Sequence, residues 1–405
     1  MSRPVIIIGA SMGGLRTAET LRRSGYGGHI VVFGDEPHAP YNRPPLSKEV
    51  LAADVNHGAV AFPLAESISD VEWILGRRVE RVDLENQIVV DELGNEHPYE
   101  ALVIATGLRS RRLGLPRKPL IGTHVIRSLD DAIALRSEIS EGTRVVVYGA
   151  GFIGCEVAAT ARKLGAHVTV VGKGPVPLLR PLGAALASDI QARQEAQGVK
   201  FFMGSTITRV TGGDRVESVL LDSGVELYAQ VLIEAIGSEP NVELLTGNDV
   251  DLDGGIGADS TLRVLRTDGT PWENVYVVGD VARFPIPKFS SQPRRVEHWN
   301  IPTDMARKVG KELALQLSGN QQGFADELGK PFAPIPSFWS DQFDVSLLAY
   351  GLLDQADDIR LLEGEVGGDC IYGYFIGDDM VGVCGIGMRS KVMAYRSQVG
   401  LTPAT

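Results

Sequence analysis

The sequence has little cysteine, no long apolar run and no excess of positive charge, and each absence excludes a class of protein. Only three cysteines occur in 405 residues, and none form a CxxC pair. Neither a disulfide framework nor a structural zinc site is therefore expected, and no metal-binding residues are predicted. No apolar run reaches the roughly eighteen residues that suggest a transmembrane helix. The net charge of −12 argues against binding to nucleic acid or to an anionic membrane surface.

The remaining composition is that of an ordinary soluble protein. Hydrophobic residues make up 44% and charged residues 22% of the chain, which is long enough for two or three domains. The first residues lead almost directly into a strand-like run, which leaves no room for a signal peptide. Together with the low cysteine content, this predicts a cytoplasmic protein.

Apolar, strand-like runs alternate with amphipathic helical patterns along most of the chain. This alternation is typical of α/β proteins with parallel sheets. Two sets of runs repeat the same order, at residues 5–8, 30–33 and 102–105 in the first set and 145–148, 168–171 and 231–235 in the second. In each set a helical pattern follows the first run and ends at a glycine, Gly25 or Gly165. The duplication predicts two related supersecondary units.

Two further patterns extend this organisation. Ser128, with Asp131 three residues later, predicts a capping box at the start of another helix. After about residue 325 the runs become short and alternating, as in IYGYFI and MVGVCGIG. We interpret this part as an antiparallel C-terminal domain.

The second unit carries the motif GAGFIG between its first strand and its helix. Gly149 permits a tight turn, Gly151 lets the backbone approach a pyrophosphate, and Gly154 lets the helix pack closely on the strand. Ile153 lies inside the motif, near the helix N-terminus that faces the phosphates. With a strand before it and an amphipathic helix after it, the motif predicts a dinucleotide site in preference to a simple glycine-rich turn.

The first unit has GASMGG at the same place. Gly9 and Gly14 are kept, Gly13 adds local freedom, and Ser11 replaces the second glycine. Serine is small, and its hydroxyl can donate to a phosphate. Asp35 follows the second strand, where a carboxylate accepts from an adenosine ribose hydroxyl. Two dinucleotide sites in one chain imply one tightly held and one exchanged nucleotide, and a flavin reduced by a nicotinamide is the natural pairing. The sequence thus predicts an oxidoreductase.

The segment PYNRPPLSKEV, residues 40–50, follows the first unit. Pro44 and Pro45 are expected to exclude a helix there and to stiffen the backbone. The stiffened segment holds Arg43 and Lys48 and contains no cysteine. Taken alone, it reads as a solvated surface loop.

Six motifs occur in order: PYNRPPLSK, IATG, IRSLDDA, GAGFIGCEVA, VYVVGD and FWSDQ. Together they resemble the FAD-dependent ferredoxin reductases that serve oxygenase systems, from the N-terminus to about residue 345. The resemblance implies a glutathione-reductase-like fold. It places an FAD domain at residues 1–112 and 244–325, an inserted NAD(P)H domain at 113–243, and a smaller α+β C-terminal domain at 326–405.

The resemblance also implies which side chains bind the cofactors. Asp280 would hold the ribityl chain of FAD, although a helix N-cap is the simpler interpretation of this residue. The other cofactor-binding residues implied in this way are Asp35, Arg43, Lys48, Val79, Thr106, Gly107, Arg127, Gly237, Trp299 and Trp339. For Arg127 a surface ion pair is the alternative, and for Trp339 a place in the core.

In related flavoproteins the segment after the first unit passes the flavin ring and often carries a redox cysteine. Here the resemblance implies direct electron transfer to an external acceptor, with Lys48 placing a positive charge near the ring. Glu156 resembles the family's acidic residue that faces the nicotinamide, and it is expected to pair with Lys48. An ordinary glutamate in the first turn of a helix is the alternative.

The chain departs from the family at the end of the second strand of the nicotinamide unit. The usual acidic residue, which binds a ribose 2′-hydroxyl, is replaced by Gly172, and Lys173 follows. The family favours NADH, whereas a lysine here can attract the 2′-phosphate of NADPH. From the sequence alone both nucleotides remain candidates.

The predicted partner is a small iron–sulfur ferredoxin that feeds a monooxygenase or dioxygenase. Ferredoxins are usually acidic, so a local basic face is expected on this acidic chain. Its candidate residues are Arg109, Arg111, Arg112, Arg117 and Lys118, or Arg294, Arg295, Arg307 and Lys308. Two other functions remain open: an NAD(P)H oxidase without a redox cysteine, and a redox-sensing flavoprotein similar to apoptosis-inducing factor.

Overall fold

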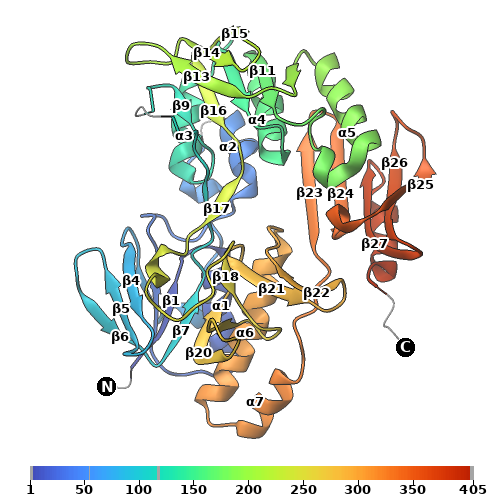
Figure 1. The fold of residues 1–405 in the computed structure, drawn as a ribbon. Coiled ribbons are helices and arrows are strands. Elements are labelled where there is room, and N and C mark those ends of the chain that lie inside the picture. The colour runs from blue at the N-terminus through green and yellow to red at the C-terminus, as the bar shows by residue number, and fades with distance from the viewer. Residues whose placement is uncertain (1–2, 54, 116–118, 402–405) are drawn as a thin grey trace.

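The structure is a computed structural model that describes residues 3–53, 55–115 and 119–401. Three large sheets organise it (Figure 1). Within the described ranges, no helix combines the length and the apolar character that crossing a membrane requires.

The first sheet has the strand order β19-β20-β7-β1-β2-β3 and is parallel except at β19. Its strands are β1 (Val5–Ile8), β2 (Ile30–Phe33), β3 (Glu72–Ile74), β7 (Ala101–Ile104), β19 (Arg263–Leu265) and β20 (Pro271–Val277). Helices α1 (Met12–Arg23) and α6 (Asn300–Leu317) pack against each other beside it. β1 and β7 are buried along their whole length, which explains their unbroken apolar runs.

The second sheet repeats this plan, with the fully parallel order β12-β11-β10-β16-β9. Its strands are β9 (Thr123–His124), β10 (Arg144–Tyr148), β11 (His167–Gly172), β12 (Lys200–Met203) and β16 (Val231–Glu234). The helices of this part are α3 (Leu129–Glu138), α4 (Phe152–Lys163) and α5 (Leu179–Ala196). The predicted capping box is present at α3, because the Ser128 hydroxyl accepts from the Asp131 N–H and the Asp131 carboxylate accepts from the Ser128 N–H.

The third sheet is antiparallel, as the alternating C-terminal runs predicted, with the order β23-β24-β27-β26-β25. Its elements are β23 (Ser337–Gln342), β24 (Val345–Gly351), β25 (Asp358–Gly364), β26 (Cys370–Ile376), β27 (Asp379–Ile386) and α8 (Arg389–Tyr395). In Figure 1 β23 and β24 lie beside α5, so this sheet closes on the second one.

Small elements connect and cover the large sheets. They are α2 (Glu49–Ala52), α7 (Gln321–Leu328), β4 (Val79–Asp83), β5 (Ile88–Asp91), β6 (Glu96–Pro98), β8 (Leu108–Ser110), β13 (Ile207–Thr211), β14 (Ser218–Leu221), β15 (Glu226–Tyr228), β17 (Ser238–Pro240), β18 (Ile256–Gly257), β21 (Ala282–Ile286) and β22 (Ser290–Arg294). Strands β8 and β17 pair where the chain passes between the first and second sheets (Figure 1).

One local prediction was wrong. Pro44 and Pro45 do not exclude a helix, because they begin the 3₁₀ turn η1 (Pro44–Ser47), which leads into α2. The first residues of a helix need no hydrogen-bonded N–H, and the fixed φ of proline suits this place. The segment is nevertheless stiff, and it presents Lys48 at the end of the turn.

Candidate functional site

Two glycine-rich loops join a strand to a helix, one in each parallel sheet. In the first, a Cβ on Gly9 would lie 2.1 Å from the Ala105 carbonyl oxygen, and a Cβ on Gly14 would lie 2.0 Å from the oxygen of Gly9. In the second, a Cβ on Gly149 would lie 2.0 Å from the Ala235 oxygen, and one on Gly154 only 1.9 Å from the oxygen of Gly149. Both loops therefore require glycine at the turn and at the helix contact, as a dinucleotide fingerprint does.

The middle position of the loop differs between the two copies without harm to the fold. A Cβ added to Gly151 meets nothing within 4 Å, so a side chain fits at this point. Ser11 holds the equivalent position at the N-cap of α1, but its hydroxyl does not cap the helix. It accepts instead from Arg43 Nε at 3.4 Å. Through Ser11, the first loop therefore contacts the guanidinium group of Arg43.

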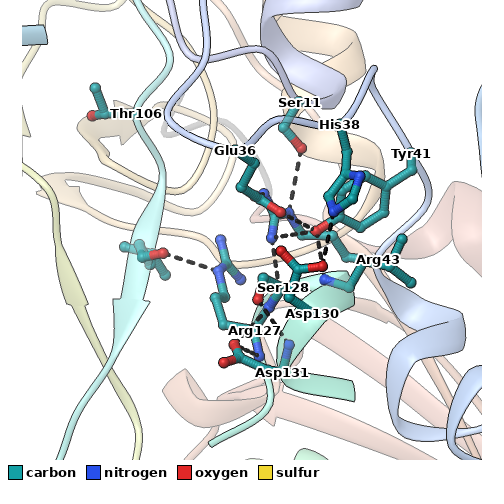
Figure 2. Close-up of polar contacts among 12 residues, drawn as sticks. Ser11, Glu36, His38, Tyr41, Arg43, Thr106, Arg127, Ser128, Asp130 and Asp131 are labelled. Carbon is teal, nitrogen blue, oxygen red and sulfur yellow. Dashed lines mark hydrogen bonds and ion pairs between the residues drawn. The ribbon is translucent and has the colours of Figure 1, made fainter. Parts of the chain in front are cut away.

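Arg43 and Arg127 lie together beside the first loop (Figure 2). Arg43 donates to the Arg127 carbonyl at 2.6 Å and to Glu36 at 2.5 Å. Arg127 approaches Asp280 at 3.9 Å. Burial lowers the pKa of Arg127, and the neighbouring Arg43 lowers it further. Burial raises the pKa of Asp280 to about 6. Two guanidinium groups held together in a partly buried place fit an anionic ligand.

Two residues in this cluster were missed by the sequence analysis. Glu36, not Asp35, makes the ion pair with Arg43, and Tyr41 donates to Glu36 at 2.5 Å while accepting from the Leu129 N–H. Asp35 is exposed. The signal was present in the sequence, because Glu36 follows Asp35 directly at the end of β2 and Tyr41 belongs to the PYNRPPLSK motif.

Further predicted residues lie at or near strand ends. Thr106 follows β7 and donates to the Asn241 carbonyl at 2.8 Å, while the Asn241 N–H donates to Gly107. Gly107 and Gly237 both have positive φ, of 62° and 98°, so both turns favour glycine. Val79 is buried at the start of β4.

Two tryptophans that the resemblance assigned to the cofactor site contact each other. Trp299 is the N-cap residue of α6, is 42% exposed, and donates to the Asn42 side chain at 3.1 Å. Trp339 on β23 meets it edge to face, with ring centroids 5.5 Å apart. Trp299 precedes a helix that lies beside the first sheet, whereas Trp339 lies on the C-terminal sheet, so the pair joins these two parts of the chain.

The predicted ion pair between Lys48 and Glu156 is present. Lys48 Nζ lies 2.6 Å from Glu156 Oε2, with side chains that are 16% and 4% exposed. The Ser47 hydroxyl donates to the same oxygen at 2.6 Å, and the Ser340 hydroxyl donates to Oε1 at 2.7 Å. Because η1, α4 and β23 each contribute a donor or acceptor, the carboxylate lies where the three parts of the chain meet.

A buried chain of hydrogen bonds continues from this carboxylate. Gln342 donates to the Ser340 hydroxyl at 2.9 Å, and Gln194 on α5 donates to Gln342 at 2.6 Å. Sequence reasoning missed this chain. The alternation in FWSDQ places Ser340 and Gln342 on one face of β23, and two polar residues on a buried face were the available signal.

The second loop lies beside the end of β11. Gly172 is buried there, and Lys173 is exposed directly after it. A Cβ on Gly172 would meet Met203 Cε at 2.8 Å and the Ala150 Cβ at 2.9 Å. The space that a carboxylate would need is thus occupied by a thioether.

Cys155 is the cysteine next to this site, since it precedes Glu156 on α4 and its backbone carbonyl accepts from Gln194 at 3.3 Å. Cys155, Cys370 and Cys384 are all buried and unpaired, and burial raises the pKa of Cys155 to about 12. Among the residues described, no group of three His, Cys, Asp or Glu side chains lies close enough together to hold a metal ion. The chemistry that the arrangement supports is that of bound nucleotides, with Lys48 and Glu156 between their two loops.

The chain is similar to known proteins over most of its length. Residues 3–306 match the family model described as pyridine nucleotide-disulphide oxidoreductase. Rhodocoxin reductase from Rhodococcus erythropolis is 33% identical, over 98% of this chain and 91% of its own length. The ferredoxin–NAD(+) reductase component of the biphenyl dioxygenase system from Paraburkholderia xenovorans is 36% identical, over 83% of this chain and 78% of its own length.

Solved structures also match nearly the whole chain. The ferredoxin reductase for the CYP199A2 system from Rhodopseudomonas palustris has a TM-score of 0.88 and 31% identity, covering 99% of this chain and 96% of that one. Putidaredoxin reductase in its covalent complex with putidaredoxin has a TM-score of 0.87 and 27% identity, with 99% and 94% covered. The predicted resemblance is confirmed, and the chain belongs to the pyridine nucleotide-disulphide oxidoreductase family.

Proposed function

We propose that this chain accepts a hydride from a nicotinamide nucleotide onto bound FAD and passes single electrons to a small iron–sulfur ferredoxin. One observation carries the proposal: two glycine loops of dinucleotide-binding type occur in separate parallel sheets, and a largely buried Lys48–Glu156 pair joins the segment after the first unit, which has no cysteine in residues 40–50, to the helix of the second unit. The relatives named as reductases of ferredoxin or rubredoxin support the acceptor. The ferredoxin would serve a monooxygenase or dioxygenase in the cytoplasm.

The first loop and its surroundings fit FAD. Arg43, Arg127 and the N-terminus of α1 would hold the pyrophosphate, Asp35 the adenosine ribose, and Asp280 the ribityl chain. When bound, FAD accepts a pair of electrons from a nicotinamide and releases them one at a time. Trp299, Thr106 and Val79 would line the remainder of the site. The second loop, with Gly149, Gly151, Ile153 and Gly154, would hold the exchanged nucleotide.

The sheets support a division of the chain into three domains. The first sheet draws its strands from residues 5–104 and 263–277, which supports an FAD domain at 1–112 and 244–325. The second sheet supports an NAD(P)H domain at 113–243, and the antiparallel sheet a C-terminal domain at 326–405. Lys48, Glu156 and Ser340 then come one from each domain.

Lys48 is the residue whose role is most directly testable. We expect Lys48→Ala to bind FAD but to be reduced at least tenfold more slowly, because the positive charge beside the ring stabilises the reduced anion. Anaerobic stopped-flow mixing with NADH, following flavin bleaching, measures this rate. Lys200→Ala, an exposed lysine at the start of β12, is the matched control. Wild-type bleaching in Lys48→Ala would remove Lys48 from the mechanism, and slow bleaching of the wild type would favour a redox-sensing flavoprotein.

The two basic clusters considered for ferredoxin docking are less basic than their sequences suggest. Arg109 and Arg111 pair with Glu239, and Arg112 pairs with Glu234, while Arg117 and Lys118 lie outside the described residues. In the second cluster Arg294 pairs with Asp354 and Arg295 with Glu297. Lys308 was a wrong candidate, because it is 8% exposed and paired with Glu312 inside the protein.

Arg307 is the best-placed member of these clusters. Its side chain pairs with Asp304 at 3.0 Å but is still 64% exposed, and it lies in a groove of about 280 Å³ between α1 and α6, which Trp299 also lines. Docking there would bring an acidic ferredoxin next to the proposed FAD site. Arg307→Glu should slow ferredoxin reduction about tenfold at low salt, with little change at high salt, whereas Arg111→Glu should not. A ferredoxin reduction rate that is flat with ionic strength in the wild type would remove the basic-face proposal.

A further inference from the structure

The two halves of the molecule can be aligned residue by residue through their sheets. Ile8 lies opposite Phe33 in the first sheet, and Tyr148 lies opposite Val171 in the second. Gly9 and Gly149 follow the first member of each pair, with φ of 121° and 120°. Phe33 and Val171 therefore correspond. The residues that follow them, Gly34 and Gly172, are then equivalent.

This correspondence is supported by what surrounds the two glycines. A Cβ on Gly34 would lie 2.6 Å from the Cβ of Ala10, and a Cβ on Gly172 would lie 2.9 Å from the Cβ of Ala150. The next residue in each half is then Asp35 or Lys173, and both are exposed. At the position that borders the adenosine ribose, the first half carries a negative charge and the second half a positive one.

The two segments that frame Lys173 carry no negative charge of their own. Segments 171–177 and 200–206, which frame the end of β11, contain no acidic residue. Lys173 makes no ion pair with any residue that the structure describes. Backbone hydrogen bonds from Ser205 to Gly172 (3.0 Å) and from Gly204 to Gly174 (2.8 Å) hold the two segments together. Lys173 is thus an exposed residue on a segment whose backbone is held by hydrogen bonds on both sides of it.

A carboxylate at this edge favours a free 2′-hydroxyl by accepting from it and rejects a 2′-phosphate by repulsion. Here neither effect is available, since Met203 fills the space beside Gly172 and Lys173 carries the opposite charge. We propose that Lys173 binds the 2′-phosphate of NADPH, so that this reductase uses NADPH at least as well as NADH. The inference rests on the proposed function of the second glycine loop as the nicotinamide-nucleotide site.

Binding of 2′,5′-ADP and of 5′-AMP isolates the 2′-phosphate from the rest of the nucleotide. By titration calorimetry on the FAD-loaded protein at low salt, we expect 2′,5′-ADP to bind at least about tenfold more tightly than 5′-AMP. The ratio should shrink as salt rises, because the contact is exposed. Equal affinities, or tighter binding of 5′-AMP, would overturn the assignment of Lys173. If neither compound bound, the nucleotide site itself would be wrong, and the proposed function would fall with it.

Variants then locate the effect. Lys173→Ala should remove the preference for 2′,5′-ADP while leaving the affinity for 5′-AMP within about twofold, and Lys173→Glu should invert the preference. Lys200→Ala, which removes an exposed lysine at the other end of the same strand pair, should keep the wild-type ratio. The kcat/KM values for NADPH and NADH should follow the binding ratios. A Lys173→Ala variant that lost affinity for both compounds equally would show that the lysine supports the site without reading the 2′ position.

Discussion

The Lys48–Glu156 pair lends itself to a quantitative test, because its environment is well defined. The two charges are 2.6 Å apart, and their side chains are 16% and 4% exposed. With an effective dielectric constant of about 20, the Coulomb attraction is about 6 kcal/mol. Desolvation of both ions opposes most of this, so the net coupling is expected to be about 2 kcal/mol.

Removal of one partner should cost more than the net coupling. Glu156→Gln removes the negative charge beside the Lys48 ammonium, which keeps only uncharged acceptors such as the Pro44 carbonyl at 3.3 Å. An uncompensated cation of this kind costs about 3 kcal/mol, and Lys48→Met should cost a similar amount by leaving Glu156 to the hydroxyls of Ser47 and Ser340. The double variant should cost about 4 kcal/mol, since it removes both buried charges together.

Urea unfolding of the FAD-loaded protein, followed by circular dichroism, measures all four corners of this cycle. Thr160→Val is a useful control, because it removes the hydrogen bond from the Thr160 hydroxyl to the Ser47 carbonyl without touching the charges. Strict additivity of the two single variants would refute the reasoning, since it would mean that the ions do not interact in the folded protein.

Further predictions concern individual residues. Gly14→Ala should abolish FAD binding, whereas Gly154→Ala should keep the yellow colour and raise the KM for the nicotinamide nucleotide at least about tenfold, because each new Cβ would strike the carbonyl of its own loop. Burial lowers the pKa of His298 from its ordinary 6.5 to about 4. The unfolded chain then binds more protons than the folded one between these values, so stability falls as pH drops from 6.5 to 4. His298→Gln should make the urea midpoint less dependent on pH in that window. Asp280, with its pKa raised to about 6, has the opposite sign: in the FAD-free protein its contribution falls as pH rises from about 4 to 6, and Asp280→Asn should remove that loss. Ser340→Ala should slow reduction by NADH less than Lys48→Ala does, and Ser340→Thr should restore the rate if the hydroxyl bond to Glu156 is what matters.

Much of the fold followed from the sequence because the two parallel sheets leave strong local patterns. Buried strands such as β1 and β10 give unbroken apolar runs. The glycines of each loop are required by close contacts with the backbone of the same unit, so their spacing is visible as a motif. The capping box at Ser128 is local and was predicted for the same reason. The 3₁₀ turn at Pro44 was not, because proline was taken as a helix breaker at a place where it begins one.

The site was less predictable where its contacts are distant in sequence. The Lys48–Glu156 pair was expected only through the family resemblance, and nothing in the local pattern around either residue specifies the other. Ser340, Gln342 and Gln194 were missed altogether, since a polar residue on a strand usually faces solvent. Arg43 was expected at the cofactor site, but its ion pair with Glu36 depends on how the loop after β2 folds back.

The strand order of the first sheet has a consequence for how the protein is made. β20 and α6, which complete that sheet and its helical cover, come after the whole of the second sheet in the chain. As the chain leaves the ribosome, the first glycine loop is therefore synthesised long before Asp280 and Trp299, which belong to the proposed FAD site. The inserted nucleotide domain can fold while the domain around it is still incomplete. Stable capture of FAD is thus expected only after residue 317 has emerged, late in synthesis. A nascent chain should therefore show the yellow colour of bound flavin only when its synthesis is nearly complete.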